Sequence, residues 1–321
     1  MSKEIIDIPK FSELERCFYP IRADPYYKGC KHDCIYCYSK AINSRFPNSW
    51  NIDNVSIGDM EGLKKLFYST FNEDKKGRKQ DLLRNRIPLR LGGITDVFQP
   101  IEKEKKITLE LIKLLNSYNY PYMIVTKSSL VGEENYLNII RRDLAYVQIS
   151  ITTLDDKQAR IIEPQASSIN ERINCMQTLI NNGIYTAARI SPIIPIHPDG
   201  YYSQFKNSNQ IDKEDITNDF FSFDLVETLC KMKPNTVLIE FLRVSPMIKK
   251  ILISENLSGI INVYNNISAK GADGTLHLSL EEKKFYCNKI KNICNKFNVD
   301  FTVCDDNNYN GATRCNMKSI A

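Results

Sequence analysis

Apolar and polar positions along the chain follow two alternating patterns. Short runs rich in β-branched and aromatic residues, which indicate strands, precede segments whose apolar residues recur every three or four positions, the spacing of a helix face. The predicted strands cover residues 17–21, 87–91, 122–126, 145–151, 186–194, 236–242 and 299–304. The predicted helices cover residues 38–46, 57–72, 107–117, 133–142, 169–182, 215–232 and 278–297.

This order of strands and helices predicts an α/β fold with a parallel sheet, because each helix supplies the crossover that parallel strands need. Six or so such units are more than one half of a Rossmann fold contains. They favour a partial (β/α)6 barrel of the TIM type, with its binding site at the carboxyl ends of the strands. The expected parts are an N-terminal lead-in (residues 1–29), the barrel core (30–244) and a C-terminal extension (245–321), with poorly patterned or irregular stretches at 200–213, 245–277 and 305–321.

The composition of the 321 residues, 42% hydrophobic and 25% charged, is that of a globular protein. No apolar run approaches the roughly 18–20 residues of a membrane span, and residues 1–7 lack a signal-peptide core, so we expect a cytoplasmic protein that does not bind membranes. The net charge of +5 is compatible with an anionic substrate. Basic residues concentrate between Lys75 and Arg90, but acidic neighbours favour a solvated connection over a phosphate-contacting surface.

Three of the ten cysteines stand within eight residues, as Cys30-x3-Cys34-x2-Cys37, on a loop after the lead-in strand. Cytoplasmic thiols are kept reduced, so this cluster indicates metal binding or catalysis rather than disulfides. Three thiolates without a fourth ligand nearby differ from a closed structural zinc site and suit an iron–sulfur cluster whose last iron keeps an open position. The alternative is a non-enzymatic zinc- or iron-binding module, with a zinc site completed by His32 or a distant cysteine.

The remaining seven cysteines are scattered along the chain. Several occupy apolar helical positions, where a cysteine is usually a small buried hydrophobe. Cys304 and Cys315 are candidates for a hydrogen donor or for ligands of a second cluster, but their wide spacing favours unrelated thiols.

The three-cysteine motif, with Tyr36 before the third cysteine and Tyr38 after it, resembles the signature of radical S-adenosylmethionine (SAM) enzymes. The resemblance extends over about residues 17–200 to the spore photoproduct lyase-like branch. It is carried, in order, by Asp24–Cys30, Thr95–Glu102, Thr126–Ser128, Ile149–Asp155, Glu163–Pro164 and Pro192–Pro195.

This resemblance implies that Cys30, Cys34 and Cys37 hold a [4Fe-4S] cluster. It also implies that the methionyl amine and carboxylate of SAM chelate the fourth iron. Reductive cleavage of SAM, with electrons from an external donor such as flavodoxin or ferredoxin, then gives a 5′-deoxyadenosyl radical that abstracts hydrogen from a substrate. The same resemblance places Tyr36 among the cofactor-binding residues.

Residues at predicted strand ends extend the cofactor site. Gly92 and Gly93 let the backbone approach a ligand closely and resemble the glycine-rich strand that meets the methionine amine, although a plain turn is the alternative. Lys127 and Ser150 resemble residues that contact the methionyl carboxylate and the ribose, for which a cation and a hydroxyl are suited. A surface lysine and an incidental strand serine are the alternatives. Thr95 follows the glycines and is a candidate contact of cofactor or substrate.

Three charged residues near strand ends have two interpretations. Asp96 follows Thr95 and either meets cofactor or substrate or starts a turn. Arg189 and Arg243 lie in or at the end of predicted strands, where a cation is costly unless paired. Each therefore binds a ligand carboxylate or phosphate, or forms a structural salt bridge.

One departure from the branch concerns the substrate. Spore photoproduct lyases carry a cysteine on the strand-two loop that returns a hydrogen atom to the repaired thymine, and the matching position here is Gly93. The lyase-like reaction outcome is therefore open. A nucleic acid or nucleotide substrate is favoured by the resemblance, by the mild basicity and by aromatic residues suited to stacking, namely Tyr26, Tyr27, Phe98 and Tyr201. A small metabolite or peptide is the alternative, which the missing thiol favours.

Overall fold

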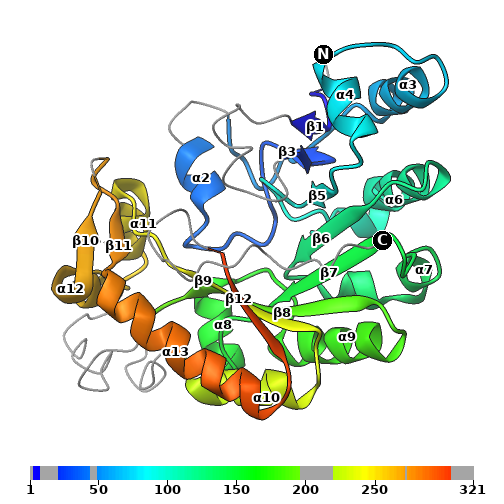
Figure 1. Cartoon of the computed structure of the whole chain (residues 1–321). Coiled ribbons are helices and arrows are strands. Elements are labelled where there is room, and N and C mark those ends of the chain that lie inside the picture. Colours follow the sequence, from blue (N-terminus) through cyan, green and yellow to red (C-terminus); the bar gives the residue numbers. More distant parts are fainter. Residues whose placement is uncertain (1–2, 8–20, 44–48, 196–219, 272, 305–321) are drawn as a thin grey trace.

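The central element of the fold is a large, mostly parallel sheet (Figure 1). A computed structural model describes residues 3–7, 21–43, 49–195, 220–271 and 273–304. The sheet contains, in spatial order, β1 (Ile6–Asp7), β2 (Arg22–Ala23), β5 (Leu89–Leu91), β6 (Tyr122–Thr126), β7 (Ala145–Ser150), β8 (Tyr185–Ile193), β9 (Thr236–Phe241) and β12 (Asp300–Val303). All pairs from β2 to β12 are parallel, and β1 is antiparallel to β2. Because β1 and β12 occupy opposite edges, the described strands form an open, partial barrel.

Helices on the outside of this sheet provide the crossovers (Figure 1). They are α3 (Met60–Phe71), α4 (Arg78–Arg84), α5 (Glu102–Lys105), α6 (Ile107–Ser117), η1 (Ser129–Gly132), α7 (Glu134–Leu137), α8 (Asp156–Ile162), α9 (Ile169–Asn181), α10 (Phe223–Lys231), α11 (Pro246–Ser254), α12 (Ser258–Ile267) and α13 (Leu280–Lys296). Two small hairpins, β3 (Tyr26–Tyr27) with β4 (Ser56–Ile57) and β10 (Ser268–Lys270) with β11 (Leu276–Leu278), and helix α2 (Tyr38–Asn43) complete the described elements. No helix in the described ranges is long and apolar enough to cross a membrane.

The two faces of the sheet differ in chemistry because successive side chains of a strand point to opposite sides. Leu89 and Leu91 are fully buried in the main hydrophobic core, which the strands share with the helices. Arg90 stands between them and therefore points to the other side, which we call the inner face. The inner face has only a small apolar cluster of its own, around Met123 and Tyr146. Polar and charged residues of the strands also lie there, namely Arg22, Gln148, Ser150, Arg189 and Glu240.

The strand predictions agree closely with the structure from residue 87 onward, and the predicted partial (β/α)6 barrel is confirmed. Two expectations differ from the structure. The strand expected at 17–21 falls almost wholly outside the described residues, and the first barrel strand is instead β2, which puts Arg22 inside the barrel. The poorly patterned residues 245–277 contain α11, α12, β10 and β11, because Ser245 accepts from the Ile248 amide as an N-cap and Pro246 begins α11. The stretches at 200–213 and 305–321 lie outside the described residues.

Candidate cluster and cofactor site

The three cysteines of the motif lie on the loop between β3 and α2, close enough for their charges to interact. Cys30 and Cys34 are buried and Cys37 is half-buried, and all three are free thiols. Burial raises the pKa of each of them, that of Cys30 to about 12. A thiolate at this place therefore needs a nearby cation, and a bound metal supplies one. The chemistry of the three thiols thus suits a metal group, but in this structure their side chains are not arranged around one ion.

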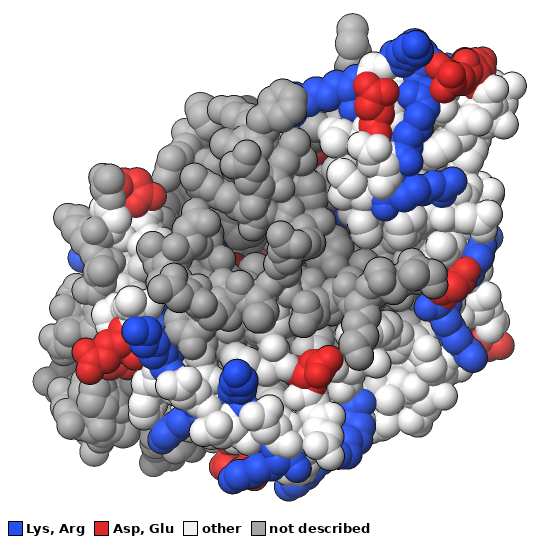
Figure 2. All heavy atoms as spheres, in the orientation of Figure 1, with Lys and Arg blue, Asp and Glu red and all other residues white. Residues whose placement is uncertain are grey.

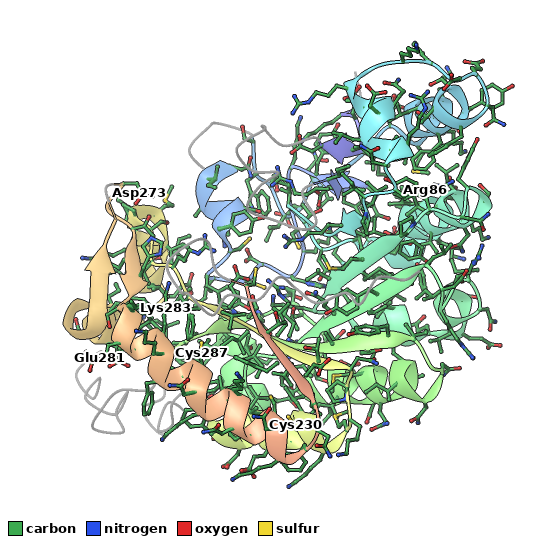
Figure 3. All side chains as sticks on the ribbon, in the orientation of Figure 1. Arg86, Cys230, Asp273, Glu281, Lys283 and Cys287 are labelled. Atoms are coloured by element: carbon green, nitrogen blue, oxygen red, sulfur yellow. The ribbon has the colours of Figure 1, made fainter. Side chains whose placement is uncertain are left out.

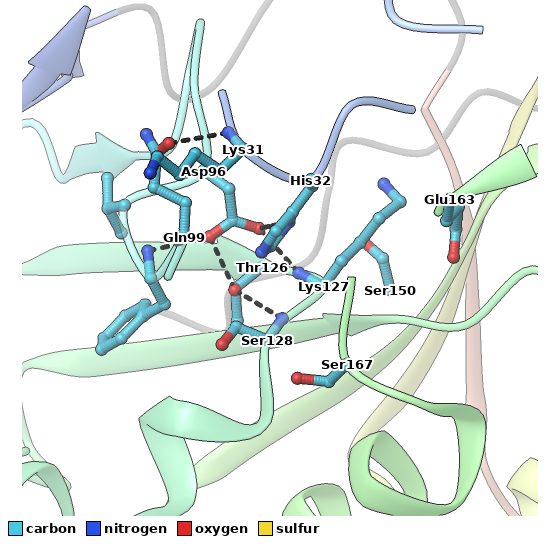
Figure 4. A network of polar contacts seen from close by, with 12 residues as sticks. Lys31, His32, Asp96, Gln99, Thr126, Lys127, Ser128, Ser150, Glu163 and Ser167 are labelled. Atoms are coloured by element: carbon cyan, nitrogen blue, oxygen red, sulfur yellow. Dashed lines mark hydrogen bonds and ion pairs between the residues drawn. The ribbon is translucent and has the colours of Figure 1, made fainter. Parts of the chain in front are cut away.

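One side of the cysteine loop is fixed by the loop that follows β5 (Figure 4). The Lys31 amide donates to Gln99 Oε1 at 2.8 Å, and His32 Nδ1 lies 3.3 Å from Asp96 Oδ2. Asp96 also accepts from the Thr126 hydroxyl and the Lys127 amide, both at 2.8 Å, at the end of β6. Burial raises the pKa of Asp96, but His32 and these two donors lower it by more, so the net pKa is below its ordinary value and the carboxylate is charged. His32 is therefore paired with Asp96, which weakens the alternative of a zinc site completed by His32.

The other side of the cysteine loop is fixed by the segment that ends α8. The Ile35 amide donates to Ile162 O at 3.0 Å, and the Gln165 amide donates to His32 O at 3.2 Å. The Tyr36 hydroxyl donates to the carboxylate of Glu163, which is itself buried. The loop that carries the cysteines is thus held between two protein segments.

Glu163 is the centre of a buried ionic network. Arg172 Nη1 lies 2.6 Å from Glu163 Oε2, and both side chains are at most 1% exposed. Burial raises the pKa of Glu163, but the charges of Arg172 and Lys127 lower it below its usual range. Arg172 also donates to the carbonyl of Ser150 at 3.0 Å, which links the network to the end of β7. The cysteine loop, β7 and α9 are therefore joined through one carboxylate.

Lys127 and Ser150 lie next to this network (Figure 4). Lys127 Nζ is 5.5 Å from the centre of the Tyr36 ring, a cation–π contact, and the lysine charge acts on the thiols of Cys34 and Cys37. No carboxylate of a described residue lies within ion-pair distance of Lys127 Nζ. The structure therefore brings Tyr36, Lys127 and the three cysteines together, with Ser150 buried beside them. It places a cation and a hydroxyl at the strand ends that the sequence indicates.

The two glycines after β5 are closely surrounded. Gly92 has a φ of 93°, and a Cβ there would lie 2.7 Å from the carbonyl oxygen of Val125, so only glycine suits the position. The carbonyl of Gly93 accepts from the Tyr38 hydroxyl. A Cβ at Gly93 would lie 2.5 Å from Cδ and 2.8 Å from Cβ of Arg22. The aliphatic stem of Arg22 thus fills the place where a cysteine side chain would stand.

Thr95 has structural contacts that the sequence does not predict. Its hydroxyl donates to the carbonyl of Tyr26 at 2.7 Å, and its amide donates to Asp24 Oδ1 at 3.1 Å. Tyr26 and Phe98 are fully buried, so the expectation that they stack on bases is wrong for these two aromatics. Tyr27 is half-buried, and Tyr201 lies outside the described residues.

Several site residues have no role in the sequence-based interpretation. Asp24, Gln99 and Glu163 belong to the segments that carry the family resemblance, but their contacts depend on three-dimensional packing. Arg172 has a signal in the sequence: it occupies a position on the apolar stripe of α9 between Ile169 and Met176, where an arginine is unusual. The Arg189 side chain pairs with Glu240, and Arg243 Nη2 lies 3.6 Å from the same carboxylate, so the salt-bridge interpretation holds for both arginines.

Two basic residues between Lys75 and Arg90 have close acidic partners. Arg84 pairs with Asp74 and Asp81, and Lys79 pairs with Glu4. Figure 2 shows acidic and basic side chains intermingled over this part of the surface. The run includes helix α4, and its pairing favours a solvated surface over a nucleic-acid contact.

Figure 3 shows Cys230 on α10 and Cys287 on α13, on helices away from the cysteine loop. Cys230 of α10 and Cys294 of α13 are buried with their sulfur atoms 3.8 Å apart, and Cys287 is buried on α13. The Cys304 amide donates to Ile239 O and extends the pairing of β12 with β9. Cys315 lies outside the described residues. Among the described residues, no three His, Cys, Asp or Glu side chains are arranged to hold one metal ion.

Comparisons with known structures show which fold this chain has. The chain aligns with a spore photoproduct lyase complexed with a dinucleoside spore photoproduct, at a TM-score of 0.61 and 14% identity, over 94% of this chain and 78% of the lyase. A variant of that lyase with AdoMet and the dinucleoside bound aligns with a TM-score of 0.60 at the same identity and coverage. The chain has the radical SAM fold. The predicted resemblance to the spore photoproduct lyase-like branch is confirmed.

Sequence comparisons match part of the chain to curated relatives, one of which is named as a radical SAM enzyme. The chain is 28% identical over 174 residues to an uncharacterised protein of Methanocaldococcus jannaschii, and this alignment covers 53% of this chain and 59% of that protein. It is 23% identical over 190 residues to the radical SAM Nalpha-GlyT isomerase of Pseudomonas phage M6, and this alignment covers 58% of this chain and 35% of the isomerase. The chain therefore spans about half the length of the curated relatives it matches, or less. No family model matches the chain.

Proposed function

We propose that this radical SAM protein is an enzyme whose Cys30, Cys34 and Cys37 hold a [4Fe-4S] cluster beside a SAM site at the strand ends. The observation that carries the proposal is the set of three thiols, two of them buried and one half-buried, on a loop held from both sides next to the Lys127 ammonium. Bound together, the cluster and SAM supply a 5′-deoxyadenosyl radical for hydrogen abstraction. An external protein such as flavodoxin or ferredoxin delivers the electron.

The residues around the thiols have separate roles in this proposal. Lys127 binds the methionyl carboxylate through a charge-assisted hydrogen bond, and the Tyr36 ring keeps its side chain in place. Ser150 contacts the ribose. Gly92 and Gly93 give the methionyl amine access to the backbone of the strand end. The buried surroundings exclude water from the radical.

A nucleotide or nucleic acid is the substrate class that we favour. The spore photoproduct lyase structures contain a dinucleoside, and the fold of this chain is similar to theirs. A small metabolite or peptide is the rival class. The stem of Arg22 beside Gly93 supports a reaction outcome different from that of the lyases, because no side chain at position 93 can return a hydrogen atom.

Anaerobic reconstitution with iron and sulfide tests the cluster. The purified protein should gain a thiolate-to-iron absorption band and, with dithionite and SAM, should release 5′-deoxyadenosine. The Cys30→Ala variant should lose both. Cys175→Ala is a matched control, because Cys175 is also a buried free thiol with its pKa raised to about 12 by burial. The proposal would be refuted if the reconstituted protein contained no iron and sulfide, or if Cys30→Ala and Cys175→Ala behaved alike. About one zinc per chain would support the zinc-module alternative.

A second test addresses the SAM site. Lys127→Met should keep the cluster but bind SAM about 10- to 100-fold more weakly, because a hydrogen bond to a charged group contributes about 1.5–3 kcal/mol. Lys113→Met, on helix α6, should bind SAM like the wild type. Equal affinities for Lys127→Met and Lys113→Met would show that Lys127 does not contact SAM.

A further inference from the structure

The inner face of the barrel carries more positive than negative charge beside the proposed SAM site. The strands place Arg22, Arg90 and Arg189 on this face, and Arg243 follows β9. Three of these cations have carboxylate partners: Arg22 Nη2 lies 2.7 Å from Asp7 Oδ2, Arg189 pairs with Glu240, and Arg243 Nη2 lies 3.6 Å from Glu240 Oε1. Asp24 and Glu240 are the other carboxylates near Arg90.

Arg90 is the cation whose charge is least matched. Its Nε atom is buried and has no hydrogen-bond partner, and none of the described carboxylates lies within ion-pair distance of its guanidinium group. A buried donor without a partner is costly, and an arginine has five donors to satisfy. Burial raises the pKa of Glu240, whereas the charges of Arg189, Arg243 and Arg90 lower it, so Arg90 belongs to the same electrostatic neighbourhood. An anion at Arg90 would satisfy its free donors.

The sheet register sets a second guanidinium group beside that of Arg90. Arg22 and Arg90 are direct partners on the parallel strands β2 and β5, and both side chains point to the inner face. Neighbouring strands are about 4.8 Å apart, so the two stems run side by side, and like charges at such positions repel. A tetrahedral phosphate offers oxygens to both forks at once, whereas a carboxylate is matched by one fork. The pair thus favours a phosphate group.

The distance along the strand relates this place to the cofactor site. Arg90 is three residues before Gly93, which at about 3.3 Å per residue is about 10 Å. The Arg22 stem reaches from this pair to Gly93 itself. A phosphate at Arg90 would therefore leave the rest of a nucleotide extending towards the strand ends, where the radical would be formed.

We propose that Arg90, together with Arg22, is a phosphate-binding site on the inner face of the barrel and that the substrate carries a phosphate or phosphodiester there. The proposal rests on the proposed function for the assignment of this phosphate to the substrate. Arg90 fixes the position of the phosphate. The distance from this phosphate to the cofactor site then determines which carbon of the substrate faces the radical.

Calorimetric titration of the reconstituted protein tests the site with three probes: inorganic phosphate, the dinucleotide thymidylyl-thymidine and the uncharged nucleoside thymidine. Phosphate and the dinucleotide should bind to the wild type, with affinity falling as salt rises. Arg90→Met should weaken both about 10- to 100-fold. Arg90→Lys should recover part of the affinity, because it restores the charge without the fork. The affinity for thymidine should be the same in the wild type, Arg90→Met and Arg90→Lys.

Arg142→Met is the matched control, because Arg142 is an exposed arginine just before β7, at the amino end of the strands. Its affinity for phosphate should equal that of the wild type. Cluster content and the urea midpoint of each variant, measured on the same samples, separate the two proposals. A wild type without a cluster contradicts the proposed function. An intact cluster with no phosphate or dinucleotide binding, or with binding that Arg90→Met leaves unchanged, overturns the phosphate site alone.

Discussion

A cysteine at position 93 would restore the thiol that the spore photoproduct lyases carry, and the structure predicts that this protein cannot accept it without cost. The new Cβ would lie 2.5, 2.7 and 2.8 Å from Cδ, Cγ and Cβ of Arg22. The first two overlaps involve the arginine stem, and its rotation out of the way would break the ion pair with Asp7. The third involves an atom attached to the backbone, so β2 or β5 must shift. Overpacking of this kind costs about 1–3 kcal/mol.

Urea unfolding of four proteins measures this cost: the wild type, Gly93→Cys, Arg22→Ala and the double variant. Arg22→Ala loses the pair with Asp7, worth about 0–1 kcal/mol for a partly exposed pair, and the packing of its stem. The double variant should then be more stable than the sum of the two changes predicts, by about 1–2 kcal/mol. Gly93→Ala should be as destabilising as Gly93→Cys, because the overlap begins at Cβ. Additive costs, or a Gly93→Cys variant with the wild-type midpoint, would refute this packing argument.

Three further outcomes are expected. Glu163→Gln should lower the free energy of unfolding by about 3–5 kcal/mol in urea titrations, because it leaves the buried Arg172 charge uncompensated; a loss below about 1 kcal/mol would contradict this. Gly92→Ala should cost about 2 kcal/mol or more, since its Cβ would meet the Val125 carbonyl at positive φ, and a wild-type thermal midpoint would argue against that. The folded-state pKa of Glu240 is below its ordinary value of 4.5, so the stability it contributes is present above about pH 4.5 and is lost as pH falls through the folded pKa. Glu240→Gln should therefore flatten the pH dependence of the unfolding free energy below pH 4.5, and an unchanged slope would exclude this role.

The sequence is a good guide where the signal is local. The run at 122–126 predicts β6 to the residue, because five consecutive strand-forming residues lie between a proline and a lysine. The cysteine motif and the strand-end positions of Lys127 and Ser150 likewise need no knowledge of packing. Fold class and the place of the candidate site were therefore predictable.

Other parts of the site depend on contacts between residues distant in sequence. The pairing of β2 with β5 sets the Arg22 stem against Gly93, and 70 intervening positions separate the two residues. The bond between His32 and Asp96 requires that the cysteine loop fold over the end of β5. The sequence does not predict helices α11 and α12, because serine and asparagine residues indicate loops, whereas here Ser245 caps α11 and Asn262 is an exposed residue of α12.

The way in which the cysteine loop is held affects how this protein would acquire and lose the proposed cluster. In small zinc domains the metal is part of the folding reaction, and chelators unfold them. Here the backbone around the thiols is positioned by Gln99, Asp96, Ile162 and Glu163, so its order does not depend on a metal. Oxidative loss of the proposed cluster would therefore leave a folded protein whose cysteine loop keeps its backbone position. Such a protein could take up a new cluster repeatedly. The barrel already orders the cysteine loop, so rebinding would not require the entropy cost of ordering it.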